Sequence, residues 1–165
     1  MIVRRATEAD YDQLREVRLE ALRLHPENFG SDLEREEAFT REEWLGRMAT
    51  AVTLGGFADD KLCGICVFAK SSNTKTGHTG EVGAMYVRKD HRGTGLADAL
   101  MEALIDVAVG HVEQLKLTVN AENIAAIKFY ERHGFRPIGK FPNSLRVGSR
   151  TYEELIMFRT VSASD

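Results

Sequence analysis

The most informative stretch of the chain reads Arg92-Gly93-Thr94-Gly95-Leu96-Ala97. Glycines at 93 and 95 let the backbone approach a ligand closely, and a helix that begins here offers unpaired N–H groups and the positive end of its dipole. This arrangement is typical of a phosphate site, although two glycines also form ordinary tight turns. The stretch fits neither common nucleotide fingerprint, because Asp98 stands at the end of the G-x-G-x-x-G pattern and no G-K-[ST] is present.

The segments on either side of this loop indicate alternating strands and helices. Residues 81–88 form an apolar run of strand length, and from Leu96 onward apolar residues recur with helical spacing. Asp59-Asp60-Lys61 has the length of a hairpin turn between two apolar runs, which should therefore pair antiparallel. The expected strands are residues 2–6, 52–58, 62–69, 81–88, 115–119, 135–141 and 152–158, and the expected helices are residues 7–24, a segment within 28–48, 95–108 and 123–133.

These elements predict the α/β class, in the form of an α+β mixed sheet of about seven strands with about four helices on both faces. The chain has 165 residues, of which 43% are hydrophobic, and this is enough apolar material for a single core. We therefore expect one domain over residues 1–160, followed by a frayed tail at residues 161–165.

The composition argues against two classes of partner. The net charge is −3 and the acidic and basic residues are interspersed, whereas a protein that mainly binds nucleic acid usually has a basic surplus. No apolar run approaches the roughly 20 residues that span a bilayer, and the N-terminus lacks the apolar core of a signal peptide. We expect a cytoplasmic protein that binds neither nucleic acid nor membrane.

The two cysteines have C-x-x-C spacing, which must be weighed as a redox or metal motif. Cys63 and Cys66 lie inside an apolar run that reads as a strand, whereas a redox pair needs a helix N-terminus to lower the thiol pKa. Buried strand cysteines are therefore favoured over a thiol oxidoreductase. The five histidines are scattered without ligand spacing, so the sequence predicts no metal site.

Residues 81–135 resemble the core of the GNAT N-acetyltransferase superfamily. Residues 92–97 fit the coenzyme motif [Q/R]-x-x-G-x-[G/A], and Met85-Tyr86-Val87 stand where the splayed strand of that family pairs with the pantetheine arm. Residues 123–135 are similar to the helix N-x-x-A-x-x-x-Y-x-x-x-G-F. The resemblance implies the GNAT acyl-CoA N-acyltransferase fold, with mostly antiparallel strands, and acetyl-CoA as the acyl donor. The residues it places against the coenzyme are Met85, Tyr86, Val87, Arg92, Gly93, Thr94, Gly95, Leu96, Ala97, Asn123, Tyr130 and Arg132.

The same resemblance implies two catalytic groups. Tyr130 occupies the place of the tyrosine that donates a proton to the departing sulfur, and its alternative is a packed tyrosine in a helix interface. Glu81 occupies the place of a glutamate base that acts through water, and its alternative is a solvated residue at the start of a strand. Glu81 and Asn120 are also expected to face the acceptor amine, although Asn120 also fits a turn, and Asn123 also fits a helix cap.

The expected reaction is direct attack of a primary amine on acetyl-CoA in a ternary complex, without an acyl-enzyme. The acceptor is expected to be a small-molecule amine or polyamine, with a protein or peptide amine left open. Acidic residues between 32 and 43 would attract a cation if they faced the site, and their favoured alternative is a solvated surface. The alternative function is a catalytically silent GNAT-fold domain that senses acyl-CoA or serves as an interaction module. The oligomeric state is left open, a homodimer included.

Overall fold

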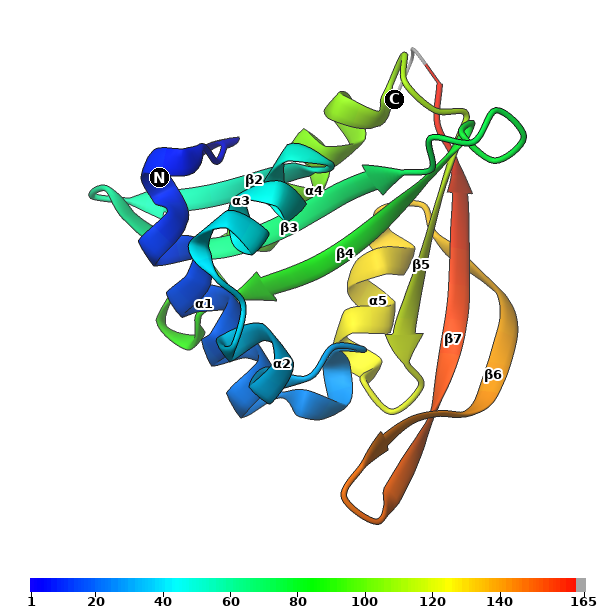
Figure 1. Ribbon diagram of the computed structural model, residues 1–165. Helices are drawn as coiled ribbons and strands as arrows, with labels where there is room; N and C mark the ends of the chain where they lie inside the picture. The colour runs from blue at the N-terminus through cyan, green and yellow to red at the C-terminus, as the bar shows by residue number, and fades with distance from the viewer. Residues whose placement is uncertain (163–165) are drawn as a thin grey trace.

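The sheet has seven strands in the order β1-β2-β3-β4-β5-β7-β6 within residues 1–162, which are the residues that the computed structural model describes (Figure 1). Every neighbouring pair is antiparallel except β4 and β5, which are parallel. The prediction of about seven mostly antiparallel strands is confirmed. The strands are β1 (Ile2–Arg5), β2 (Val52–Ala58), β3 (Lys61–Lys70), β4 (Thr79–Val87), β5 (Gln114–Asn120), β6 (Arg136–Val147) and β7 (Arg150–Thr160).

Five α-helices cover the two faces of the sheet in the described part of the chain. One face carries α1 (Tyr11–Leu24), α2 (Leu33–Glu37) and α3 (Arg41–Ala49), seen at the front of Figure 1. The other carries α4 (Leu96–Ala108) and α5 (Ile124–Arg132), whose buried residues join the larger core cluster with β3, β5 and β7. Short 3₁₀ turns at Glu8–Asp10, Pro26–Asn28 and Lys89–His91 lead into or out of α1 and α4.

The expected single helix within residues 28–48 is two helices, because Thr40 starts a new one. Its hydroxyl accepts from the Glu43 N–H at 3.2 Å, and the Glu43 carboxylate accepts from the Thr40 N–H at 3.1 Å. This reciprocal pair is a capping box, which satisfies two N–H groups at the start of α3. A capping box marks a helix start, so α2 ends before it.

The last two strands are longer than residues 135–141 and 152–158. Polar side chains bridge the distal part of the β6–β7 hairpin: Ser144 Oγ donates to Glu154 at 2.6 Å, and Thr151 Oγ1 bonds Asn143 Oδ1 at 3.1 Å. Apolar alternation therefore misses this part of the hairpin, since side-chain hydrogen bonds hold it instead of apolar packing. The Asp59-Asp60 turn between β2 and β3 is as expected, with φ of 49° and 63°, which suit a tight hairpin.

Both cysteines are buried in β3 and belong to the larger core cluster. Burial raises the pKa of Cys66 to about 12, so this thiol stays protonated at neutral pH. A reactive redox thiol needs the opposite shift.

Residue 161, near the C-terminal end of the described chain, is fixed by packing and by a backbone hydrogen bond. Val161 is buried, and its N–H donates to Glu113 O at 2.9 Å. Residues 163–165 of the expected frayed tail lie outside the described residues.

Candidate active site

The opening between β4 and β5 positions the site. The two strands pair only at Thr79–Glu81 with Gln114–Lys116 and then diverge, as Figure 1 shows. A cavity of about 510 Å³ fills the gap. Beyond Glu81 the β5-facing edge of β4 has no strand partner within residues 1–162, so its backbone groups are available to an extended, amide-rich ligand.

The glycine loop stands at one end of β4, and its backbone has free donors. Gly93 and Gly95 have φ of 71° and 86°, in the left-handed region that glycine adopts without strain. Ala99 donates to Gly95 O at 3.0 Å, and among the described residues the N–H groups of residues 93–98 have no partner. Six consecutive free donors at the start of a 13-residue helix form a site suited to an anion such as a pyrophosphate.

A substitution at Gly95 tests this use of the loop. A Cβ at Gly95 would meet no atom of the protein within 4 Å, so a methyl group there would stand in the space open to a ligand. We expect Gly95→Ala to weaken acetyl-CoA binding about tenfold or more, measured by calorimetry. Gly148→Ala in the β6–β7 turn is the matched control, because Gly148 also has positive φ, 61°, and open space around it. Both variants should lose stability by about 1–2 kcal/mol, but equal coenzyme affinity in the two would contradict the loop's role.

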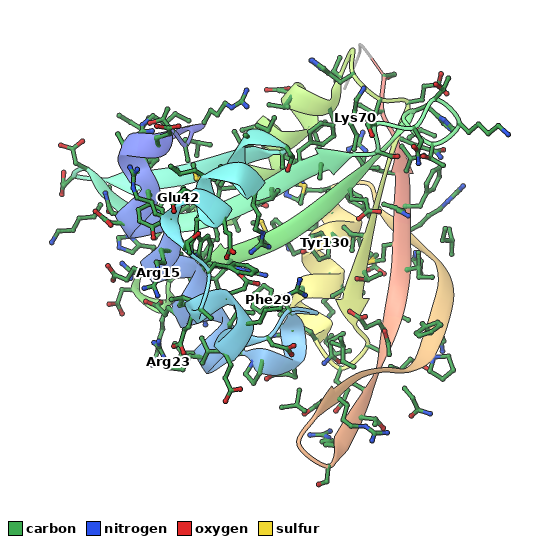
Figure 2. All side chains as sticks on the ribbon, viewed as in Figure 1. Arg15, Arg23, Phe29, Glu42, Lys70 and Tyr130 are labelled. Atoms are coloured by element: carbon green, nitrogen blue, oxygen red, sulfur yellow. The ribbon has the colours of Figure 1, made fainter. Side chains whose placement is uncertain are left out.

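Tyr130 stands in the wall of the same cavity. It projects from α5 and is 8% exposed, with its ring edge-to-face against Phe129 and Phe135 at centroid distances of 5.3 and 5.9 Å (Figure 2). Within residues 1–162 its hydroxyl has no hydrogen-bonding partner. Burial, with the nearby Cys66, raises the pKa of Tyr130 above its ordinary value, so the phenol stays protonated across the physiological range. A protonated hydroxyl with an unused donor is the form required of an acid.

Other predicted residues meet Tyr130 at this cavity. Met85, Tyr86, Val87, Arg92, Ala97, Asn120 and Asn123 all line it. The Asn123 side chain accepts from the Ala126 N–H at 3.2 Å, so it caps α5 as well. Asn120 is 3% exposed and is held at both ends of its amide, donating to Glu27 O at 2.8 Å and accepting from the Glu122 N–H at 2.9 Å.

Side chains from α1 hold the end of β4 in place. The Tyr86 hydroxyl donates to Glu20 at 2.9 Å, and Arg88 forms ion pairs with Glu20 at 2.9 Å and with Glu16. Burial and the Glu20 carboxylate raise the pKa of Tyr86. Between the paired part of β4 and this anchor, Ala84 has φ of 52°, at an irregularity in the pairing with β3. Positive φ at alanine costs roughly 1 kcal/mol, so the local packing maintains this bend beside the cavity.

Six predicted residues are not part of the cavity wall: Gly93, Thr94 and Gly95 belong to the loop before α4, and Glu81, Arg132 and Leu96 lie elsewhere. Glu81 is exposed and forms an ion pair with Lys116 at 3.1 Å, at the last paired position before the strands diverge. Arg132 forms an ion pair with Asp98 at 3.1 Å, and Asp98 also contacts His133 at 2.7 Å. Leu96 is buried against Gly56 in the core, so any contact with a coenzyme would have to use its backbone.

The connection between α1 and α2 supplies residues that the sequence analysis did not single out. His25, Asn28 and Phe29 line the cavity, and Figure 2 labels Phe29. His25 Nε2 lies 3.4 Å from an Arg92 guanidinium nitrogen. The 3₁₀ turn at Pro26–Asn28 places these side chains, and a lone histidine beside a proline gave no motif that could have revealed it.

The described residues contain no group of three or more His, Cys, Asp or Glu side chains placed to hold a metal ion. Among them, no helix has both the length and the apolar character to cross a membrane.

Known proteins are similar to this chain in sequence or in architecture. The family model described as the acetyltransferase (GNAT) family matches residues 14–135. A mycothiol acetyltransferase of Corynebacterium aurimucosum is 32% identical over 129 residues, which are 70% of this chain and 40% of that protein. The chain thus spans less than half the length of this relative.

Two solved structures illustrate the likeness in fold. A GNAT-family acetyltransferase from Streptococcus pneumoniae superimposes with a TM-score of 0.84 at 24% identity, over 97% of this chain and 98% of that one. A putative acetyltransferase from Salmonella typhimurium, solved with its cofactor acetyl-CoA, has a TM-score of 0.80 at 20% identity, over 98% and 94%. The family match covers most of the chain, and the seven-stranded fold agrees with it, so this chain belongs to the GNAT acetyltransferase family.

Proposed function

We propose that this chain is an N-acetyltransferase that moves the acetyl group of acetyl-CoA to a primary amine. The observation that carries the proposal is that three features lie at the gap between β4 and β5. They are the free N–H groups at the start of α4, the unpaired edge of β4 and the Tyr130 hydroxyl. These features match the pyrophosphate, the amide-rich arm and the departing sulfur of acetyl-CoA, in that order.

The proposed step is direct attack in a ternary complex. The neutral amine attacks the thioester carbonyl carbon and forms the new C–N bond. A backbone N–H near Met85 or Tyr86 stabilises the carbonyl oxygen, and the C–S bond then breaks. The sulfur takes up the proton of Tyr130, the nitrogen loses its proton to a base, and an equivalent proton returns to Tyr130 through solvent, so the enzyme is restored. The cavity wall includes no cysteine among the described residues, and both thiols are buried in β3, so a cysteine acyl-enzyme has no support here.

The base is proposed to be Glu81, reached through water. Its position at the last paired residue of β4 supports this role, since a chain of water can run from there along the open edge. We expect Glu81→Gln to lower kcat/KM about tenfold or more, while Lys116→Gln, which removes the ion-pair partner, leaves it within about twofold of the parent. His25→Gln is the comparison, because His25 is a titratable group in the cavity wall. A larger loss in His25→Gln than in Glu81→Gln would contradict the assignment to Glu81.

The alternative of a silent acyl-CoA sensor is separated from the enzyme by one assay. Thiol release from acetyl-CoA is followed with polyamines, amino acids, aminoglycosides and short peptides. Release that depends on an amine supports the transferase. Tight binding of acetyl-CoA without release for any amine would favour the sensor. The cytoplasmic location and the homodimer stay predictions.

A further inference from the structure

A second cavity of about 360 Å³ lies on the opposite side of β4, under α1 and α3. Its charged side chains are Arg18, Glu36 and Arg47, and apolar residues such as Val67 form much of the rest. The other polar residues of the wall are Trp44, Tyr11, Thr50 and Thr53. Gly83 and Ala84 line this cavity and the acetyl-CoA cavity alike. The two cavities therefore share a rim on β4, just beyond the last residue that pairs with β5.

Two donors in this wall are buried without partners. The Glu36 carboxylate accepts from Arg18 Nε at 3.0 Å and from Arg18 Nη2 at 3.1 Å, which leaves Arg18 Nη1 unused. Trp44 is 7% exposed, and its Nε1–H is also unpaired. Among the side-chain nitrogen and oxygen atoms of residues 1–162 that have almost no surface accessible to solvent, these are the two without a partner. Leaving such groups unpaired is unfavourable, and neither can accept, so the missing partner is a hydrogen-bond acceptor.

The charge of the wall indicates which acceptor it is. Arg18 and Arg47 both contact Glu36, at 3.0 and 3.3 Å, so the three side chains together carry one net positive charge. A carboxylate would balance that charge, whereas a phosphate dianion would exceed it. The apolar wall suits a hydrocarbon side chain on the same molecule.

The shared rim places such a molecule next to the gap between β4 and β5. Gly83 is paired with Val67, so a side chain at position 83 would lie on the same face of the sheet as Val67. A Cβ built on Gly83 would meet no atom within 4 Å. The face of β4 that borders the second cavity is therefore open at this position. We propose that the second cavity holds the carboxylate end of the acceptor, which is an amine with a carboxylate and an apolar side chain, such as an apolar amino acid. This inference rests on the proposed acetyl transfer.

One residue of the acidic run that suggested a polyamine is buried, while the other acidic residues between 32 and 43 are exposed. Glu36, within that run, is fully buried against Arg18 and Arg47 and does not face solvent. The charge of Glu36 is already balanced inside the protein, so this residue does not attract a polyamine. The second cavity favours an acidic group on the ligand instead.

Binding to this cavity has a built-in reporter, because Trp44 is the one tryptophan in the chain. Its emission is titrated with leucine, with isocaproate, which lacks the amine, and with isoamylamine, which lacks the carboxylate, and the matched phenylalanine set is run in parallel. We expect saturable changes with at least one amino acid and its deaminated acid, and no change with the decarboxylated amine. Equal responses to the amine and the amino acid, or no response to any compound, would overturn the proposal.

Turnover tests the same contact without relying on fluorescence. Trp44→Phe keeps an aromatic ring but lacks the N–H, and we expect it to raise KM for the preferred amino acid about tenfold, with KM for acetyl-CoA and for the decarboxylated amine unchanged. Phe39→Leu is the control, because Phe39 packs edge-to-face on Trp44 at 5.9 Å and leaves the N–H intact. It should keep the preference for the amino acid. An unchanged preference in Trp44→Phe would contradict the proposal.

The experiments distinguish an error in the proposed carboxylate site from an error in the proposed acetyl transfer. If decarboxylated amines are acetylated as efficiently as amino acids, the transferase stands and the carboxylate site is wrong. If no amine releases thiol, the transferase is wrong, and the Trp44 titration still reports whether carboxylates bind.

Discussion

Tyr130→Phe is expected to lower kcat about 100-fold or more while leaving acetyl-CoA affinity within about twofold of the parent. The ring packs against Phe129 and Phe135, and phenylalanine keeps those contacts, so the substitution removes little beyond the hydroxyl. That hydroxyl is the proton donor in the proposed step. Without it the sulfur must leave as a thiolate, and this loss appears in the transition state and not in coenzyme binding. Steady-state kinetics and calorimetry together measure the two quantities.

Tyr152→Phe is the matched control for this experiment. Tyr152 lies on β7 beneath Arg150, outside the cavity wall, and loses the same hydroxyl in the substitution. Its kcat should match the parent. The pH profile gives a second check, because the raised pKa of Tyr130 keeps the phenol protonated up to at least about pH 10. Activity should therefore rise with pH as the amine loses its proton, and a fall between pH 7 and 9 or an unchanged kcat in Tyr130→Phe would contradict the assignment.

Glu36→Gln is expected to reduce the free energy of unfolding by about 3–5 kcal/mol. The carboxylate is fully buried and accepts two hydrogen bonds from Arg18, with Arg47 at 3.3 Å. An uncharged amide leaves the Arg18 guanidinium, which is mostly buried, without its counter-charge. Urea unfolding of parent and variant measures the difference. The neighbouring Glu37→Gln is the control: Glu37 is 44% exposed and lies 3.7 Å from Arg23, so its loss should cost less than about 1 kcal/mol.

The pH dependence of this difference has a defined sign. Burial alone would raise the pKa of Glu36, but hydrogen bonds from Arg18 and Ser31 and the charges of Arg18 and Arg47 outweigh it, and the pKa is lowered. A carboxyl group with a lowered pKa in the folded protein stabilises the fold fully above its unfolded value, about 4.3, and less as the pH falls through the folded value. The gap between parent and variant should stay constant from pH 8 to 6 and narrow only in acid. A gap that grows as the pH falls would contradict the ion-pair account.

Much of this fold is readable from the sequence because local signals agree with it. The glycine loop, the helix after it and the Asp59-Asp60 hairpin lie where apolar spacing and turn residues predict them. Asn123 and Tyr130 share one helix, and the spacing of that helix brings the cap and the hydroxyl to one cavity. The distal β6–β7 hairpin was missed, since polar side chains hold it and leave no apolar alternation.

The second cavity could not be predicted, because its residues are far apart in the chain and each has an ordinary surface pattern. Arg18 stands in α1 among other charged residues, and Glu36 stands in an acidic run. Only the packing of α1 against α2, α3 and β3 buries them together. Likewise, the partners of Glu81 and Arg132 are set by cross-strand register and by the approach of α5 to α4, which local sequence does not encode.

The most direct test of the account is mass spectrometry of a single reaction that contains the protein, acetyl-CoA and an accepted amine. We predict that free thiol and N-acetylated amine form in equal amounts, and that the mass of the protein stays unchanged at every time point. Tyr130→Phe should slow both products together. A protein that gains an acetyl group and then passes it to the amine, or that forms no N-acetylated product with any amine class, would contradict direct transfer in the cavity between β4 and β5.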